Sequence, residues 1–216
     1  MNDLRIEKKI VLGVHKSDFL KKKLLENGFT RHFQDREISS LYIDTIDYNN
    51  AKDNINGISR RKKIRLRWYN NDTSEIFIEE KNKNNFTVWK NIESFNFKLN
   101  KQNLLKKFSC LSTLKNNNFL KNNNYKFILR TNYKRSYWLS SNYKIRATID
   151  NNLKTASFFS NNFINLPDTI LEFKFSPEDE NNFRDLFREN FYDLRINKYS
   201  KYVRSFIALE ECGYQL

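Results

Sequence analysis

The sequence predicts an α+β fold rich in β-structure, an antiparallel barrel of about eight strands with helices packed outside it. Several stretches alternate apolar and charged residues with the period of two that marks a β-strand. Their charged faces carry mainly Arg and Lys, and amphipathic helices are present to cover the apolar faces. If the helices cover the outside, the charged faces turn inward and line a barrel just wide enough for side chains or one slender ligand.

Strands with this pattern follow one another along the chain. They are predicted at 4–14 (LRIEKKIVLGV), 38–47 (ISSLYIDTID), 62–69 (KKIRLRWY), 75–81 (EIFIEEK), 126–139 (KFILRTNYKRSYWL), 143–150 (YKIRATID) and 170–175 (ILEFKF). In KKIRLRWY the alternation sets Lys63, Arg65 and Arg67 opposite apolar residues. In ILEFKF it does the same for Glu172 and Lys174. The strand at 126–139 is long, and a bulge is expected within it.

Helices are predicted at 16–28, 100–115, 177–191 and 198–213. Ser17 and Ser200 are the expected N-caps, because a hydroxyl there can accept a hydrogen bond from an amide of the first turn. Gly28 is an expected stop signal. Pro177 stands near the start of its helix, with acidic residues in the first turn that suit the helix dipole. Neither a linker nor a repeat is visible, so a single domain over 1–216 is expected.

The composition indicates an anionic partner. The 216 residues include 39 Lys and Arg against 25 Asp and Glu, a formal net charge of +14. Such a surplus favours nucleic acid, phosphate-rich metabolites or an acidic membrane surface as the partner. With 39% hydrophobic residues the chain can still bury a core, so a globular fold is expected.

Several familiar kinds of site are not supported by the sequence. Its four glycines compose neither GxxxxGK nor GxGxxG, and its two histidines form no HExxH or other metal-ligand spacing. Two cysteines do not make a disulfide framework. The apolar run at 10–14 is short and flanked by charge, so it is neither a signal peptide nor a membrane span, and a cytoplasmic location is expected.

The charged strand faces have two interpretations. On a single strand such a face most often meets water, as in many antiparallel sheets. Here several strands together favour Arg and place carboxylates two residues from a cation, which is unusual for a solvent face. Inside a barrel, unpaired like charges about 4 Å apart repel by roughly 4 kcal/mol at an effective dielectric of 20. Because the internal glutamates are too few to neutralise the cations, a thin, multiply charged anion such as a chain of phosphates is expected between them.

A family resemblance agrees with this expectation. The string RKKIRLRWY, followed by IFIEEK, resembles the core of the VTC domain, the catalytic domain of the vacuolar transporter chaperone polyphosphate polymerase. SSLYIDTIDY, YKRSYW, KIRATID, ILEFKF and NKYSKY resemble further parts of that domain in the same order, between Arg5 and Tyr202. The resemblance implies the triphosphate tunnel fold of the CYTH-like superfamily. It also implies transfer of the ATP γ-phosphate to a growing polyphosphate chain.

The resemblance also implies roles for individual residues. Arg65 and Arg67 match an Arg-x-Arg pair that holds the nucleotide triphosphate. Lys201, with Ser200, matches a phosphate contact at the start of the last helix, where free amides help to bind an anion. Lys90, in VWKN, matches a lysine of the family's GEKSVK stretch, although the residues around it differ. Four tunnel-wall cations are implied to contact phosphates: Lys81, Arg135, Arg146 and Lys174.

A divalent metal, manganese or magnesium, is implied as the cofactor, with ATP, pyrophosphate and polyphosphate as the partners. Glu172 matches the family's metal-binding glutamate, and Glu7 is a second expected ligand. RIEKK, however, holds one glutamate where related triphosphatases have paired ones.

Polyphosphate polymerase is the favoured function among four. A hydrolase of the same fold would use water as the nucleophile and commonly has more carboxylates. A non-catalytic polyphosphate-binding module would lose the metal glutamate, which is present here as Glu172. A nucleic-acid binder would stack bases on aromatic side chains, but the aromatics are expected mostly to alternate away from the cations, so no nucleic acid is expected. Phosphoryl transfer needs positioning and charge neutralisation more than a histidine or a covalent nucleophile.

Overall fold

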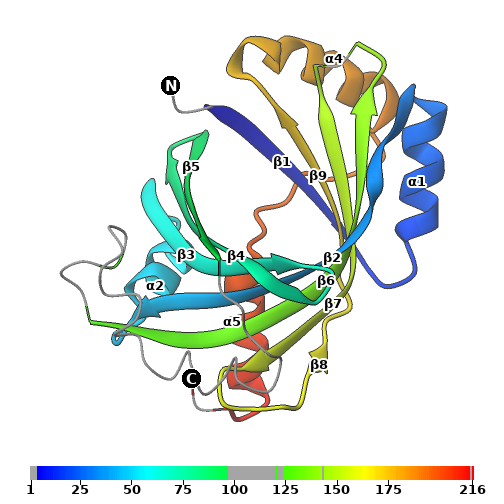
Figure 1. Cartoon of the computed structure of the whole chain (residues 1–216). Coiled ribbons are helices and arrows are strands. Elements are labelled where there is room, and N and C mark those ends of the chain that lie inside the picture. Colours follow the sequence, from blue (N-terminus) through cyan, green and yellow to red (C-terminus); the bar gives the residue numbers. More distant parts are fainter. Residues whose placement is uncertain (1–3, 97–119, 121–123, 143, 215) are drawn as a thin grey trace.

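The computed structural model describes residues 4–96, 120, 124–142, 144–214 and 216. Its strands form one antiparallel sheet in the order β6-β2-β3-β4-β5-β1-β9-β7-β8, and an additional pairing of β6 with β7 closes eight of them into a ring (Figure 1). The strands are β1 (Arg5–Leu12), β2 (Phe29–Thr45), β3 (Arg60–Tyr69), β4 (Asp72–Asn84), β5 (Thr87–Asn96), β6 (Tyr125–Ser140), β7 (Arg146–Ser157), β8 (Ile164–Asn165) and β9 (Thr169–Phe175). The fold is therefore the β-rich α+β barrel that the sequence predicts.

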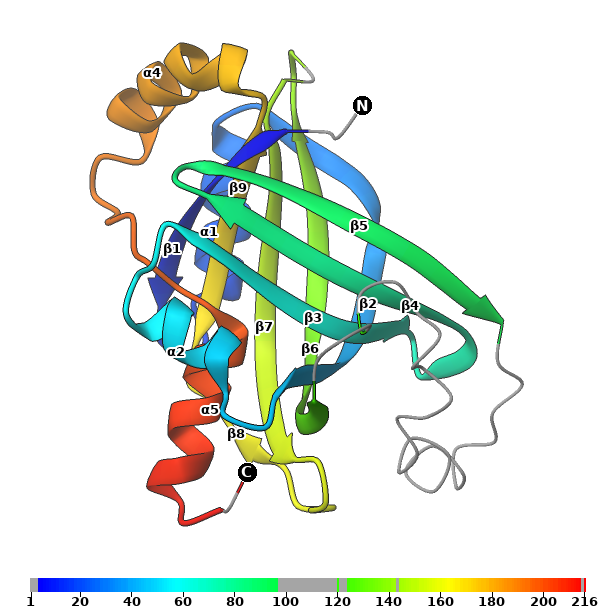
Figure 2. The same ribbon diagram turned by 90° about the vertical axis from the view of Figure 1, so that its left-hand side faces the viewer.

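The helices lie outside the ring of strands (Figures 1 and 2). They are α1 (Ser17–Glu26), α2 (Asn49–Ile55), α4 (Glu180–Asn190) and α5 (Lys201–Glu211), and a 3₁₀ turn (Pro177–Asp179) leads into α4. The apolar faces of β1, β6, β7 and β9 pack against α1 and α4 in one cluster, in which Phe173 contacts Phe183 with ring centres 5.5 Å apart. The apolar faces of these strands thus point out to the helices, and their charged faces point in.

An aromatic stack and a buried carboxylate hold α5 against the barrel. Tyr202 on α5 stacks on Tyr42 of β2 with ring centres 4.9 Å apart, and its hydroxyl donates a hydrogen bond of 2.6 Å to the buried Asp44. The same carboxylate accepts the amides of Asn50 and Ala51 at the start of α2. One buried acid therefore ties β2, α2 and α5 together, and this fixes where α5 begins.

Most predicted elements are confirmed, with differences at their ends. The strand predicted at 38–47 belongs to a longer strand that begins at Phe29, and β5 was not predicted as a strand. The expected bulge in β6 is present, because β6 advances two residues, from Leu129 to Phe127, where its partner β2 advances one. The helix predicted at 100–115 lies outside the described residues.

One of the two predicted helix caps is wrong. Ser200 caps α5 by accepting a hydrogen bond of 3.3 Å from the amide of Val203. Ser17 is instead the first residue of α1, whose N-cap is Lys16, and its hydroxyl accepts a hydrogen bond from the Asn151 amide on β7. The Ser17 hydroxyl is thus engaged by Asn151 of β7 and makes no capping hydrogen bond to the first turn of α1.

The ring has one weak seam, between β1 and β5. These strands pair only through Arg5↔Val88 and Ile6↔Thr87, whereas β1 and β9 pair along nearly the whole of β1. An ion pair inside the barrel spans the seam, because Lys81 Nζ on β4 lies 2.5 Å from Glu7 Oε2 on β1. Charged side chains in the interior therefore help to hold the barrel closed.

Candidate active site

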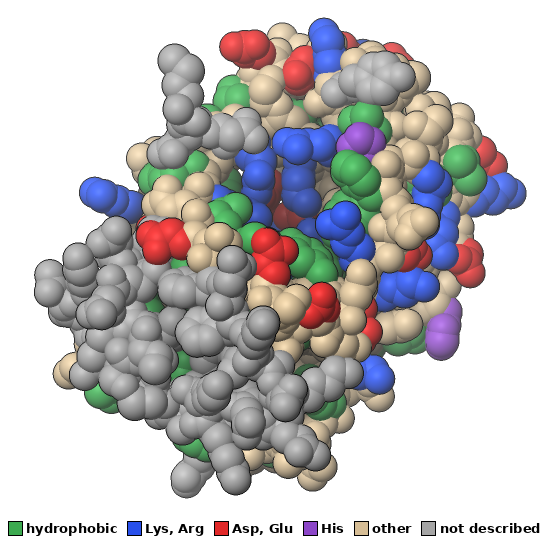
Figure 3. All heavy atoms as spheres, viewed as in Figure 1, with side chains coloured by type: hydrophobic (Ala, Val, Ile, Leu, Met, Phe, Trp, Pro, Cys, Tyr) green, Lys and Arg blue, Asp and Glu red, His purple; other side chains and the backbone are tan. Residues whose placement is uncertain are grey.

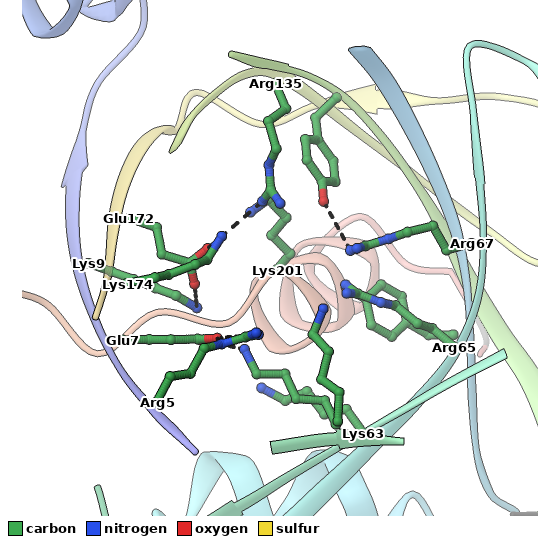
Figure 4. Close-up of a pocket in the computed structure, with 14 residues that line it drawn as sticks. Arg5, Glu7, Lys9, Lys63, Arg65, Arg67, Arg135, Glu172, Lys174 and Lys201 are labelled. Atoms are coloured by element: carbon green, nitrogen blue, oxygen red, sulfur yellow. Dashed lines mark hydrogen bonds and ion pairs between the residues drawn. The ribbon is translucent and has the colours of Figure 1, made fainter. Parts of the chain in front are cut away.

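The inside of the ring is a narrow tunnel lined with cations. Its free volume is small, about 60 Å³, because long side chains reach into it from all sides (Figures 3 and 4). Ten of the lining residues are Lys or Arg, two are Glu and two are Tyr: Arg5, Lys9, Lys63, Arg65, Arg67, Lys81, Lys90, Arg135, Lys174, Lys201, Glu7, Glu172, Tyr42 and Tyr133. The tunnel therefore suits a slender ligand that carries several negative charges.

Glu79 on β4 organises one wall of the tunnel. Its Oε2 accepts hydrogen bonds of 2.8 and 2.5 Å from Arg65, and its Oε1 one of 3.2 Å from Arg67. Lys90 lies 3.6 Å from the same carboxylate. Burial acts to raise the pKa of Glu79, but Arg65 and Arg67 outweigh it and hold that pKa well below its usual value. The acid is ionised and fixes both guanidinium groups of the Arg-x-Arg pair in place.

Asp150 on β7 organises the opposite wall. It is fully buried and accepts hydrogen bonds of 2.5 and 2.7 Å from Arg135 and one of 2.5 Å from Lys201. Tyr133 lies between these cations, with Lys201 Nζ 4.6 Å from its ring centre. Burial opposes ionisation of the phenol, yet Arg135, Arg67 and Lys201 lower the pKa of Tyr133. The start of α5 is thereby held against the tunnel through Lys201.

Glu172 and Glu7 lie on the neighbouring strands β9 and β1. Glu172 is 3.0 Å from Lys174, 3.5 Å from Lys9 and 3.9 Å from Arg135. Glu7 is 3.1 Å from Arg5 and 2.5 Å from Lys81. Burial alone would raise the pKa of Glu7, but the cations led by Lys81 lower it to about 2, and Lys174 and Lys9 likewise lower the pKa of Glu172. Both carboxylates are therefore ionised and engaged by cations.

The acids do not balance the cations. The ten lining cations meet Glu7, Glu172, Glu79 and Asp150, which leaves a formal surplus of six positive charges. Among the described residues, no carboxylate forms an ion pair with Lys63, and the buried Nε of Arg67 has no hydrogen-bond partner. A buried, unpartnered donor is costly unless a ligand satisfies it, so both groups point to an anion in the tunnel.

The pKa values of the lysines reflect this surplus. Burial lowers the pKa of Lys81 to about 8, and neighbouring Lys9 adds to the effect. Burial and then Lys9, Lys81 and Arg61 lower the pKa of Lys63 well below its usual value, and burial does the same for Lys90. An anion between these amines would favour their charged forms, so ligand binding and protonation are coupled.

A divalent metal fits the two glutamates only together with a ligand. No cluster of three or more His, Cys, Asp or Glu that could hold a metal exists in the described part of the chain. Magnesium in phosphate-transfer sites is commonly held by one or two carboxylates plus substrate phosphates. Glu172 and Glu7 are ionised oxygen donors that face the tunnel, so they fit this mode and would hold the metal against bound phosphate.

The structure brings most of the predicted site residues together. Those that line the tunnel are Arg65, Arg67, Lys81, Lys90, Arg135, Lys174, Lys201, Glu7 and Glu172. Arg146 is exposed at the start of β7 and does not line the tunnel, so its contact with phosphate stays a prediction. The side chain of Ser200 is engaged in capping α5, and only its neighbour Lys201 reaches the tunnel.

Five residues that line the tunnel were not assigned to the site. Arg5, Lys9 and Lys63 alternate with predicted site residues on the same strand faces, so the period of two could have identified them. Tyr42 and Tyr133 were missed because tyrosine is expected on the apolar side of a strand. Both instead lie beside arginines, and their hydroxyls accept long contacts of 3.5 Å from Arg65 and 3.4 Å from Arg67.

Comparison with known proteins places the chain in a family. A family model of the VTC domain matches residues 4–209. The chain belongs to the VTC domain family. A search of curated proteins finds no match to this VTC domain.

Solved structures show the same fold at low sequence identity. A candidate adenylyl cyclase from Hippeastrum with a dominant triphosphatase activity superposes with a TM-score of 0.56 at 13% identity, covering 100% of this chain and 98% of that one. A protein from Pyrococcus furiosus gives 0.55 at 12% identity, covering 93% and 99%. A candidate adenylate cyclase from Vibrio parahaemolyticus gives 0.52 at 16% identity, covering 93% and 96%. This VTC domain therefore has the triphosphate tunnel fold. None of its described helices combines the length and apolar character needed to span a bilayer.

Arg65→Ala and Arg67→Ala are each expected to weaken ATP binding about tenfold or more, because a hydrogen bond to a charged group contributes about 1.5–3 kcal/mol. The strand is expected to remain, since Ile64 and Leu66 keep its buried apolar face. Isothermal titration calorimetry measures the affinities. Arg60→Ala is the matched control, because Arg60 lies exposed on the same strand and does not line the tunnel. Unchanged ATP affinity in both tunnel variants would contradict the assignment.

The lowered pKa of Lys63 predicts a pH dependence of opposite sign for binding and for stability. Phosphate raises that pKa, so affinity for tripolyphosphate is greatest below the pKa of the free protein and falls, by at most about tenfold per pH unit for one proton, as pH rises through it. The unfolded chain, with an ordinary pKa of 10.5, binds more protons than the folded one in this window, so the stability of the free protein rises with pH. Calorimetry in buffers of different ionisation enthalpy measures proton uptake, and Lys63→Gln should take up fewer protons. Equal uptake in wild type and Lys63→Gln would remove Lys63 from the coupling.

Proposed function

We propose that this VTC domain is a polyphosphate polymerase that transfers the γ-phosphoryl group of ATP to the end of a polyphosphate chain inside the tunnel. In this reaction an oxygen of the terminal phosphate forms a bond to the γ-phosphorus. The bond from that phosphorus to the β–γ bridging oxygen breaks, and ADP leaves. The surplus of six positive charges in a closed, narrow tunnel is the observation that carries the proposal.

The tunnel's own residues suit such a transfer. Arg65 and Arg67, held in place by Glu79, present planar guanidinium groups that bind phosphate oxygens in pairs. On the opposite wall Asp150 holds Arg135, which offers a second guanidinium, and Lys201, which offers a single ammonium charge. Because both sets are fixed before the ligand arrives, they stabilise the charge of the transferring group with little reorganisation.

The state of the acids favours phosphate over water as the nucleophile. Attack by water is aided by a general base, and a base works best with a pKa near the operating pH. The pKa values of Glu7, Glu79, Asp150 and Glu172 all lie below their usual values, because each carboxylate is engaged by cations. The terminal phosphate of a polyphosphate chain is already an anion and needs no base. Arg5 also lines the tunnel and pairs with Glu7, so this carboxylate too is neutralised by a neighbouring cation.

A metal would add charge neutralisation to this arrangement. Bound by Glu172 and Glu7, magnesium or manganese would supply a Lewis acid for phosphate oxygens. The protein's contribution is to keep both carboxylates ionised through Lys9, Lys81 and Lys174.

Triphosphate hydrolysis is the second candidate function. The similar Hippeastrum protein has a dominant triphosphatase activity, and the shared tunnel fold would serve either nucleophile. The two functions use the same donor and differ in the acceptor.

Incubation of the purified protein with ATP and manganese separates these candidates. A polymerase gives ADP and a ladder of polyphosphate on a gel that resolves it from free phosphate. A hydrolase gives free phosphate in amounts equal to the ADP formed. If the protein binds polyphosphate but consumes no ATP, both catalytic functions are excluded and it is a non-catalytic polyphosphate-binding module.

Glu172→Gln separates a metal ligand from a purely structural ion pair. The variant is expected to bind polyphosphate at least as tightly as wild type, because one repelling charge is removed. Its synthesis from ATP and manganese should fall about hundredfold or more, since a metal contributes several kcal/mol of charge stabilisation. Glu80→Gln is the matched control, because Glu80 is a mostly buried acid paired with Lys62 on the same strand as Glu79, but it does not line the tunnel. Synthesis by Glu172→Gln within a few-fold of wild type, or an equal loss in both variants, would remove Glu172 from the mechanism.

A further inference from the structure

One end of the tunnel carries aromatic side chains around an exposed arginine. We call this group the aromatic mouth, and its members are Phe33 and Arg36 on β2, Tyr69 on β3, Phe77 on β4 and Tyr137 on β6. The Arg36 guanidinium lies 5.9 Å from the ring centre of Phe33, 5.7 Å from that of Tyr69 and 5.9 Å from that of Tyr137. Phe33 meets Tyr137 edge-on at 5.9 Å, and Tyr69 meets Phe77 at 6.1 Å.

The aromatic mouth continues the tunnel wall. Tyr69 follows Arg67 by two residues on β3, and Tyr137 follows Arg135 by two residues on β6. The Cα atom of each tyrosine is therefore about 6.6 Å along the strand from that of a tunnel arginine, and both side chains lie on the same face. Arg36 is the cross-strand partner of Arg135. A triphosphate held by Arg67 and Arg135 would bring a group attached to its end to the mouth.

An irregularity in β2 makes this arrangement possible. Phe33 pairs with Tyr137 and Arg36 pairs with Arg135, so β2 uses three residue steps where β6 uses two. In a regular strand, residues three apart point to opposite faces. The extra residue of the bulge turns both Phe33 and Arg36 to the tunnel side, and bulges often re-aim side chains in this way.

Packing alone does not account for the aromatic mouth. Phe33 is 51% exposed, and Arg36 is also exposed. No acid in the described ranges forms an ion pair with Arg36. Trp138, the next residue along β6 from Tyr137, shows the contrast, because it points to the other face and is buried in the core. An exposed ring beside a guanidinium that no described acid neutralises, at the end of an anion tunnel, offers both a flat apolar surface and a positive charge.

We propose that the aromatic mouth is a nucleobase-stacking subsite, which makes the tunnel bind a nucleoside triphosphate in preference to inorganic triphosphate. The base stacks on Phe33 and Tyr137, and Arg36 binds the phosphate or sugar that joins the base to the phosphates in the tunnel. Because stacking uses the π-face that every base has, the subsite accepts more than one base. This inference rests on the proposed function, in which the tunnel binds the triphosphate of ATP.

The test compares two ligands, ATP and inorganic tripolyphosphate, by isothermal titration calorimetry with the full chain. Phe33→Ala, and Phe33→Ala combined with Tyr137→Leu, are expected to weaken ATP binding about five- to 150-fold, the range that loss of one stacked base gives. Tripolyphosphate affinity is expected to stay within about twofold of wild type, as for independent sites. Phe86→Ala is the matched control, because Phe86 is 76% exposed in the turn beyond the other end of β4. It should change neither affinity.

The two ligands also show which part of the account fails. Equal ATP affinity in wild type and both Phe33 variants, with tripolyphosphate still bound, would overturn the stacking subsite and leave the tunnel intact. Parallel losses for both ligands would also overturn it, because the variants would then act on the tunnel as a whole. Failure of wild type to bind either ligand would overturn the proposed function, and the subsite with it.

Discussion

The structure depends on confining more positive than negative charge inside a closed barrel. Four buried carboxylates hold the cations in position, but they leave a formal surplus of six charges. Lowered pKa values of Lys63, Lys81 and Lys90 relieve part of the resulting repulsion. The free protein therefore stores an electrostatic cost that an anionic ligand removes. Binding, protonation and stability of the barrel are linked through that single imbalance.

Apolar packing on the outside and ion pairs on the inside together form the barrel. Helices α1 and α4 cover apolar faces that would otherwise meet water, and this turns the charged faces inward. The ion pair between Glu7 and Lys81 spans the seam at which β1 and β5 barely pair. The acids thus close the barrel and fix the cations, and they have little basicity left for activating water.

Much of this arrangement follows from the sequence, because a period of two assigns each side chain to a face. Once Arg65 and Arg67 are assigned to the inner face, the same alternation assigns the inward-facing residues of the other strands. A bulge interrupts this alternation, so it cannot be followed through irregular backbone. The bulge in β2 could not be predicted, so Phe33 and Arg36 were not connected with the tunnel. The expectation that aromatics mostly point away from the cations is incomplete for the same reason, since Tyr69 and Tyr137 share faces with tunnel arginines.

Thermal unfolding with and without tripolyphosphate tests the central claim most directly, with potassium chloride at equal ionic strength and a single-stranded oligonucleotide as comparisons. At 100 times its dissociation constant, a ligand that binds only the folded state adds about 2.7 kcal/mol, which corresponds to a rise in Tm of about 5–10 °C for a chain of this size. The account predicts such a rise for tripolyphosphate and a much smaller one for chloride. A tripolyphosphate effect no larger than that of chloride, or an equal effect of the oligonucleotide, would contradict a tunnel built to hold a chain of phosphates.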